Sequence, residues 1–263
     1  MVAAVVVVGV VTVLLVANTE PGAGPRPTTM TKPTSTPTRD TTVPPPSPRP
    51  TLTVDSGCRI GKGSTHLVAV PRPVTDRVNR AWERIEKWLA AHAPATAATL
   101  APPATLDQIA ESQRDIGVPI PADLIAFLLR HDGAGTSRKP GFTLPPFYQP
   151  MSAKDIVAEA KMMCEVLIGS GYNESVGSWW HGQVVPFARD GGGGNLLLDQ
   201  RPGHNGRLGD HDEESDMYFT QYPPTLTELL EQTATSLETS RVVVGSYRPM
   251  VVAGGVLDWD LVR

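Results

Sequence analysis

The sequence predicts a folded region that combines α-helices with a central β-hairpin, and three observations support this. From Val74 onward, apolar residues recur at the spacing of amphipathic helices. Two continuously apolar runs, 184–188 and 196–198, flank the four glycines 191–194, which predicts a hairpin in the middle of a covered sheet. Sequences of the form Thr-x-x-Gln and Thr-x-x-Glu mark places where helices begin.

The four glycines also suggest a phosphate-binding loop. Such a loop requires a helix directly after the glycines, with Lys and Ser or Thr at its start. Here Asn195 continues into the second apolar run and no Lys follows. The glycines therefore favour a hairpin turn, and nothing in this stretch predicts catalysis.

The first helix is predicted from Val74 to the proline at position 94. Its apolar residues fall on one face, so we expect Trp82 and Trp88 in the core rather than on a binding surface. The residues of this face are Val78, Ala81, Trp82, Ile85, Trp88 and Leu89.

The second helix begins with the capping box Thr105–Gln108 and ends at Gly117. Gln113 lies on the apolar stripe of this helix. Because a buried amide must find hydrogen-bond partners, we expect Gln113 to bind backbone groups nearby.

Three more helices are predicted to begin at Pro121, Ser152 and Thr225, and strands are predicted at 242–244 and 250–252.

Two side chains with potential ligand chemistry, His131 and Cys164, are interpreted as packed residues. Cys164 could pair with Cys58 only if the preceding linker reached inward, and two cysteines alone do not establish a disulfide.

The chain before Val74 divides into two parts. Residues 2–17 are almost continuously apolar and uncharged, so 1–17 is predicted to be a single-pass membrane anchor, with a cleaved signal segment as the alternative. Residues 18–73 are predicted to be a disordered Pro/Thr-rich linker, since twenty of the residues in 18–51 are Pro or Thr. We therefore expect a membrane-associated protein whose domain, 74–263, folds without residues 1–73. The sequence leaves open which side of the membrane the domain occupies.

Charge is distributed unevenly along the chain. Residues 1–73 contain seven Lys or Arg and three Asp or Glu, whereas 74–263 contain sixteen and twenty-four. A net charge of −8 in the predicted domain argues against nucleic-acid binding, which needs Lys and Arg for phosphate contacts. Such a charge could attract a basic protein partner.

The densest carboxylates lie just after the hairpin. Alternating acidic and histidine side chains in this stretch could bind a hard cation or zinc. The spacing matches no metal motif and lacks the glycine and terminal glutamate of a calcium loop. We therefore expect a solvated acidic loop, no metal and no cofactor. The carboxylates are Asp210, Asp212, Glu213, Glu214 and Asp216, with His211 between the first two.

The order of these features resembles the SUKH superfamily, and within it the cell-wall-assembly-regulator (Smi/Knr) family. The resemblance covers about 74–263 and depends on the order and spacing of many short motifs. They include residues 82–89, LAPPATLDQI at 100–109, Ile116-Gly117, 120–124 and His131-Asp132-Gly133. The later ones are 185–188, 194–199, Pro202-Gly203, Gly206-Arg207, Tyr247-Arg248-Pro249 and Leu257-Asp258-Trp259. The chain departs from the family at Gln113, where a glutamate is usual, and in its predicted anchor and linker.

The resemblance implies an α+β domain in which N-terminal helices pack on a mostly antiparallel sheet, with one more helix before the last strands. Bacterial members of the family are thought to be immunity proteins that bind and neutralise toxins. Fungal members are linked to cell-wall regulation through protein contacts. Neither role is enzymatic. In agreement with this, no single motif of the sequence groups a nucleophile, a base and an oxyanion donor, as an active site would require.

The favoured hypothesis is therefore a non-enzymatic protein-binding module, an immunity protein for a basic toxin domain. The alternatives are a membrane-tethered scaffold in cell-wall or envelope regulation, and a metal-dependent enzyme that uses Asp210, His211 and Asp212. For the first, the five carboxylates are the predicted binding residues, because carboxylates complement a basic surface and speed association. Trp179 or Trp180 is expected to add an aromatic anchor, with the other in the core.

Overall fold

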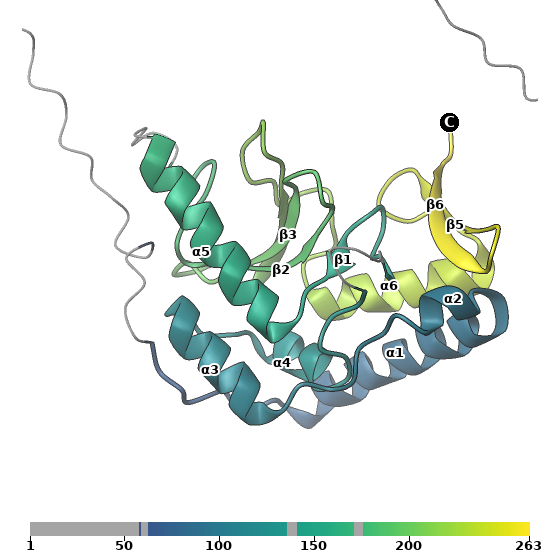
Figure 1. Cartoon of the computed structure of the whole chain (residues 1–263), viewed down its shortest axis with the longest axis horizontal. Helices are drawn as coiled ribbons and strands as arrows, with labels where there is room; N and C mark the ends of the chain where they lie inside the picture. The colour runs from purple at the N-terminus through teal and green to yellow at the C-terminus, as the bar shows by residue number, and fades with distance from the viewer. Residues whose placement is uncertain (1–57, 59–62, 136–140, 171–175) are drawn as a thin grey trace, which may run out of the picture. The chain divides into compact units, whose positions relative to one another are not determined.

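The computed structural model describes residues 58, 63–135, 141–170 and 176–263 (Figure 1). The predicted anchor 1–17 and most of the predicted linker lie outside these residues. Within the described ranges, every helix is too short or too polar to cross a bilayer.

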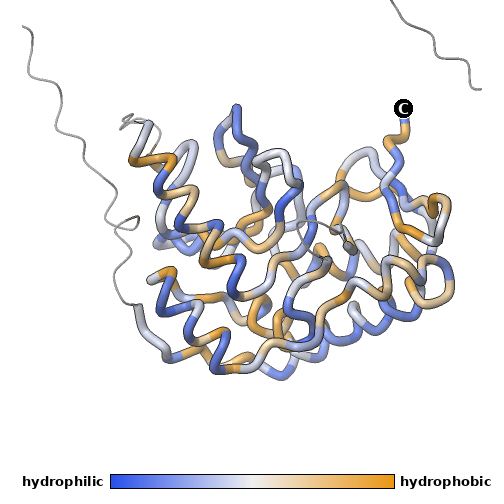
Figure 2. The backbone as a smooth tube through the Cα atoms, in the orientation of Figure 1, coloured by the Kyte–Doolittle hydropathy of each residue, from blue (hydrophilic) through white to orange (hydrophobic). Residues whose placement is uncertain are grey.

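Most of the helices form one layer of the molecule. α1 (Arg72–His92) packs against α4 (Ala122–Leu128) and α6 (Leu226–Thr239). α2 (Pro94–Ala97) follows α1 directly, and α3 (Leu106–Ile116) packs against α5 (Ala153–Ser170). In Figure 2 apolar and polar stretches alternate along the helices, as expected of helices that bury one face.

The predicted apolar face of α1 is confirmed, and it explains why this helix lies in the core. Five of its six apolar residues are buried, and Trp88 packs partly buried against them. The ring of Trp82 meets those of Phe127 and Phe142 at centroid distances of 5.1 and 5.5 Å. Helix α1 begins at Arg72, two residues earlier than predicted, because Pro73 fits the first turn of a helix.

The start and end of α3 follow the sequence closely. Thr105 and Gln108 form the reciprocal capping box, and Gly117 ends the helix with a left-handed conformation at φ 72°. Gln113 is buried and binds backbone groups, as expected. Its Nε2 donates to the carbonyl oxygens of Ser64 and His66, and its Oε1 accepts from the amide of Ile120.

The main sheet is antiparallel, with strand order β1-β2-β3-β4. Its strands are β1 (Gln149–Pro150), β2 (Val184–Arg189), β3 (Asn195–Asp199) and β4 (Arg207–His211). The predicted hairpin is β2 and β3, and it occupies the middle of the sheet. All of β3 and all of β2 except Arg189 are buried, which is why their sequences do not alternate.

A separate two-stranded sheet closes the chain. It consists of β5 (Tyr247–Val252) and β6 (Val256–Leu261), which turn at Gly254 and Gly255, both at positive φ. The strand predicted at 242–244 is wrong. Only Val243 pairs there, by an isolated bridge to Tyr247, because the chain turns at Val244 and Gly245 with φ of 47° and 75°.

The two faces of the main sheet are covered by two hydrophobic clusters. The larger cluster lies among the helices and includes Val185, Phe187, Leu196 and Leu198 of the central strands. The smaller one lies under the second half of α5 and includes Val184, Leu197 and Trp180. The first half of α5 contributes to the larger cluster and its second half to the smaller one, so both faces of the hairpin are covered by helical residues.

The smaller cluster contains a disulfide between Cys58 and Cys164, whose Cα atoms lie 5.2 Å apart. Cys164 is buried on α5 as expected, but it is not a free core thiol. Gln113 also binds the carbonyl groups of residues 64 and 66. The packed region therefore includes residues before Val74, the position at which the change in composition predicted the domain boundary.

Candidate protein-binding surface

Four of the predicted carboxylates form an exposed loop directly after β4: Asp212, Glu213, Glu214 and Asp216. Asp210 was predicted to share this loop, but it lies within β4 and is half-buried. Its backbone pairs with Leu196 of β3 on one side and with Tyr218, through an isolated bridge, on the other. The acidic loop is therefore shorter than the sequence predicted.

The acidic loop lies against the glycine-rich turn of the hairpin. A Cβ atom added at Gly193 would lie 2.6 Å from Oε2 of Glu213, so glycine allows the close approach. Asp190 shapes the turn, because its Oδ1 accepts from the amides of Gly192 and Gly194 at 2.7 and 2.9 Å. Asp190 is itself exposed and belongs to the same acidic edge.

Sequence reasoning missed Asp190 as a member of this surface. The available signal was a carboxylate directly before a glycine run in a predicted hairpin, which places it at the tip. With Asp190 included, five exposed carboxylates gather here, and none forms an ion pair with another described residue. Their charge is therefore not neutralised by these residues of the chain. We call Asp190, Asp212, Glu213, Glu214 and Asp216 the acidic edge.

The two predicted tryptophans divide between surface and core. Trp180 is only 1% exposed and belongs to the smaller hydrophobic cluster. Trp179 is partly exposed, and its Nε1 donates to the backbone oxygen of Glu213 at 3.1 Å. Trp179 thus holds the acidic loop in place and is the member of the pair that a partner can touch.

His211 lies between the two tryptophans and the acidic edge. Its ring is fully buried, with the rings of Trp179 and Trp180 edge-on at centroid distances of 4.8 and 5.5 Å. Burial lowers the pKa of His211 to about 4, although the charges of Asp212, Asp190 and Asp216 oppose this shift. The pKa of the adjacent Asp210 carboxyl shifts upward instead, because burial and the charge of Asp212 raise it to about 6.

The metal hypothesis finds no support in this geometry. Successive residues of a strand point to opposite faces, so Asp210 and His211 cannot share a site. Among the residues that the structure describes, no group of three His, Cys, Asp or Glu side chains is arranged to hold a metal ion.

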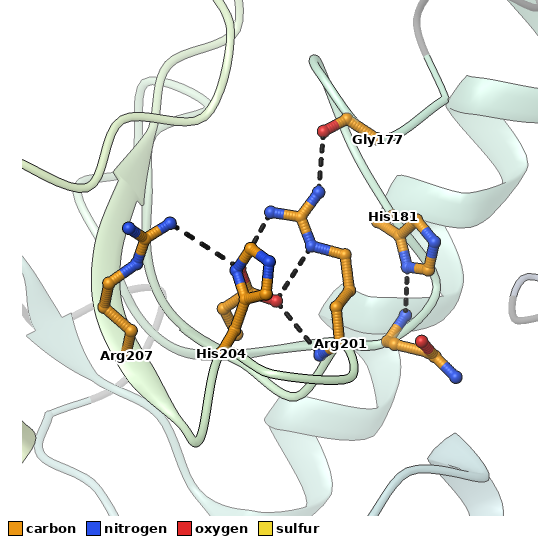
Figure 3. A network of polar contacts seen from close by, with 7 residues as sticks. Gly177, His181, Arg201, His204 and Arg207 are labelled. Carbon is orange, nitrogen blue, oxygen red and sulfur yellow. Dashed lines mark hydrogen bonds and ion pairs between the residues drawn. The ribbon is translucent and has the colours of Figure 1, made fainter.

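A second polar network lies at the other end of β4 (Figure 3). The Asp199 carboxylate is fully buried and accepts two hydrogen bonds from the guanidinium of Arg201, at 2.9 and 2.7 Å. Nδ1 of His204 lies 2.6 Å from the same carboxylate, and Nη2 of Arg207 lies 4.0 Å from it. Burial acts to raise the pKa of Asp199, but the hydrogen bonds and charge of Arg201 hold it below its usual value.

Arg201 also joins two surface segments, because its Nη1 donates to the carbonyl oxygen of Gly177 at 2.8 Å. The guanidinium carbon of Arg207 lies 4.1 Å from the ring centroid of Phe219. Sequence reasoning assigned this cluster no role, because only the fold brings Arg201 and Arg207 to the same carboxylate.

Comparison with known proteins identifies the middle of the chain. Residues 103–232 match the model of the SMI1 / KNR4 family (SUKH-1), a range that runs from just before α3 into α6. No protein with a curated description matches the chain. The match includes the main sheet, the acidic edge and the Asp199 network, and it confirms the resemblance inferred from the sequence motifs. This part of the chain belongs to the SMI1 / KNR4 family (SUKH-1).

Proposed function

We propose that this protein is a non-enzymatic module that binds a protein partner through its acidic edge. The observation that supports this most directly is the set of five exposed carboxylates without ion-pair partners among the described residues. The family is compatible with an immunity-like binding role. A partner that meets this edge must present Lys or Arg side chains.

The finer proposal is that the partner is a toxin domain with a basic surface, which the module neutralises by covering that surface. Complementary charge mainly accelerates the encounter and fixes the orientation. Affinity then requires a buried anchor, and the half-exposed ring of Trp179 beside the acidic loop is suited to that role.

The test uses the full chain and a candidate basic toxin domain encoded beside it. Asp212, Glu213, Glu214 and Asp216 are replaced together by Asn or Gln, and association rates are measured at two salt concentrations. We expect slower association and a weaker salt dependence, because screening acts on these charges.

The matched control neutralises four exposed carboxylates elsewhere, Asp76, Glu83, Glu111 and Glu165, which changes net charge equally. If both four-residue variants slow association to the same extent, net charge rather than the acidic edge is responsible, and this surface is not the site.

The disulfide favours a second candidate function, a membrane-tethered scaffold in the cell envelope. Structural disulfides persist in oxidising compartments and are rare in the cytosol. We propose that the apolar segment 2–17 anchors the chain and that the domain lies on the oxidising side of the membrane. Its partner is then an envelope protein, or a toxin encountered outside the cytosol.

This placement is tested by trapping thiols in intact cells with a membrane-permeant alkylating reagent. Cys58 and Cys164 should resist labelling until the protein is denatured and reduced. Labelling after denaturation without reduction would contradict the placement, because it would mean that the two thiols are reduced in the cell.

A further inference from the structure

Arg207 differs from the other described arginines that form ion pairs with carboxylates, because each of those donates at least one hydrogen bond to its partner. Arg114 and Arg189 donate one each. Two each are donated by Arg77, Arg84, Arg130, Arg201 and Arg248. Arg207 approaches Asp199 only to 4.0 Å, which is beyond hydrogen-bond range, and its guanidinium has no hydrogen bond to another described residue. Its planar fork of donors is therefore unused within the described fold.

This guanidinium is nevertheless held in a defined position. It lies 4.1 Å from the centroid of Phe219, a distance typical of cation–π contacts. The ring of Phe219 in turn packs closely over Gly209, since a Cβ atom added at Gly209 would lie only 2.5 Å from it. This packing fixes the position of the Phe219 ring. The Nε atom of Arg207 is buried, while the side chain as a whole is 42% exposed, which leaves its outer nitrogens accessible.

The surroundings of Arg207 carry surplus positive charge. Asp199 is the only described carboxylate within ion-pair distance of Arg201 or Arg207, so two guanidinium groups share one negative charge. The donors of Arg201 are already used by Asp199 and by the carbonyl of Gly177. The unmatched charge therefore resides on Arg207.

We propose that Arg207 is a docking site for a single carboxylate of the protein partner, supplied by an Asp, a Glu or a chain terminus. A guanidinium fork matches a carboxylate with two parallel hydrogen bonds. Because the guanidinium is already oriented by Phe219, little side-chain freedom is lost on binding.

Charge decides between a carboxylate and a phosphate. One carboxylate neutralises the single surplus charge at this site, whereas a phosphate dianion exceeds it. Residues 74–263 also carry a net charge of −8, which disfavours polyanions such as nucleic acid or an anionic membrane surface. A partner protein with mixed charge fits both ends of β4, since its basic groups meet the acidic edge and its carboxylate meets Arg207.

This inference rests on the proposed function for the nature of the partner, but the site can be tested without it. The full chain is titrated with sodium acetate, and with sodium chloride at equal ionic strength, while the Arg207 Nε–H and the amides of 203–207 are followed by NMR. We expect saturable shifts with acetate only. Arg207→Gln should weaken acetate association about tenfold or more, as expected on losing a charge-assisted pair.

Arg248→Gln is the matched control, because Arg248 is an exposed arginine whose ion pair with Asp260 lies in the other sheet. It should leave the acetate titration unchanged. Equal shifts in chloride, or an unchanged titration in Arg207→Gln, would overturn the site. Tighter binding of inorganic phosphate than of acetate would overturn the assignment to a carboxylate.

The partner provides the final comparison. Arg207→Gln should weaken its binding, whereas neutralising the acidic loop should slow its association. If acetate binds at Arg207 but the candidate toxin does not bind the full chain, the proposed partner is wrong and the carboxylate site stands. A partner that binds the Arg207→Gln variant with undiminished affinity would show that it does not dock there.

Discussion

At the scale of single residues, Gln113 joins α3 to the segment that precedes α1. Its amide nitrogen faces two carbonyl oxygens, those of Ser64 and His66, and its oxygen faces the amide of Ile120. Only a side chain that both donates and accepts satisfies all three groups. A glutamate, usual in the family that the sequence resembles, cannot donate when it is ionised.

We predict that Gln113→Glu destabilises the protein by about 1–3 kcal/mol at pH 7, the range for leaving buried groups unsatisfied. Burial against two carbonyls raises the pKa of the new carboxyl in the folded state, so the loss should shrink as the pH falls toward 4. Urea unfolding at pH 5 and pH 8 measures this. Gln108→Glu, an exposed change in a helix first turn, is the control and should be nearly neutral at both pH values.

Asp210 and His211 should oppose each other in the response of stability to pH. The pKa of His211 falls from an ordinary 6.5 to about 4 on folding, so its contribution is present above pH 6.5 and is lost as the pH falls to 4. The pKa of Asp210 rises from 3.8 to about 6, so its contribution is present below pH 3.8 and is lost as the pH rises to 6.

The measurement is the free energy of unfolding between pH 4 and pH 6.5, compared with the unsubstituted protein. Asp210→Asn should make stability fall more steeply on acidification, and His211→Phe should make it fall less steeply. Parallel pH profiles for the two variants and the unsubstituted protein would contradict both assignments.

Residue roles were predictable from sequence where one helix fixed them. Gln113 lies on an apolar stripe, and the need to satisfy a buried amide predicted its backbone partners. Asp210 was wrongly placed in the acidic loop because strand β4 ends only one residue after it, at His211. Arg207 could not be assigned, since its partners Phe219 and Asp199 meet it only through the sheet.

At the scale of elements, α1 depends on one large buried side chain. Trp82 is fully buried against the rings of Phe127, Phe142 and His131. We predict that Trp82→Ala destabilises the protein by about 3–5 kcal/mol through lost apolar contact and the cavity left behind. Trp259→Ala should act similarly, because Trp259 is only 4% exposed in β6.

Trp88→Ala is the matched control on α1. Its ring is only partly buried and stacks on His92, so a clearly smaller loss is expected in urea unfolding. A loss below about 1 kcal/mol at Trp82 would mean that α1 is not anchored by this side chain.

The disulfide ties α5 to the chain before α1. We predict that replacing Cys58 and Cys164 together by Ser lowers the free energy of unfolding by about 2–4 kcal/mol, because the open chain gains freedom when unfolded. A reducing agent should lower the stability of the unsubstituted protein by a similar amount and leave the double variant unchanged. Equal stability of the oxidised and reduced proteins would contradict this role.

Elements were predictable where the local sequence determines their structure. Predictions were wrong or missing where contacts between distant parts of the chain determine it. The hairpin of β2 and β3 follows from two apolar runs and a glycine turn. The segment 242–244 looks like a strand, yet Val244 adopts a positive φ that its sequence does not indicate. The disulfide joins residues 106 positions apart, and no local pattern predicts such a contact.

At the scale of the whole molecule, stability should depend on residues before Val74. A truncated protein that starts at Cys58 keeps the disulfide, the carbonyl partners of Gln113 and the first turn of α1. One that starts at Val74 lacks all three. We predict that both fold and that the shorter protein unfolds at a clearly lower denaturant concentration. Coincident unfolding curves would show that residues 58–73 contribute nothing.

The disulfide also sets the route by which mechanical load crosses the protein. A pull on the chain before Cys58 passes through the sulfur atoms to Cys164, so the intervening residues, including α1, α3 and α4, carry no tension. Stretching the oxidised molecule therefore cannot extend that 106-residue loop. Reduction releases it and adds roughly 360 Å of extended chain. The oxidised domain can therefore be extended only along the residues that follow Cys164, whereas the reduced domain can be extended along its whole length.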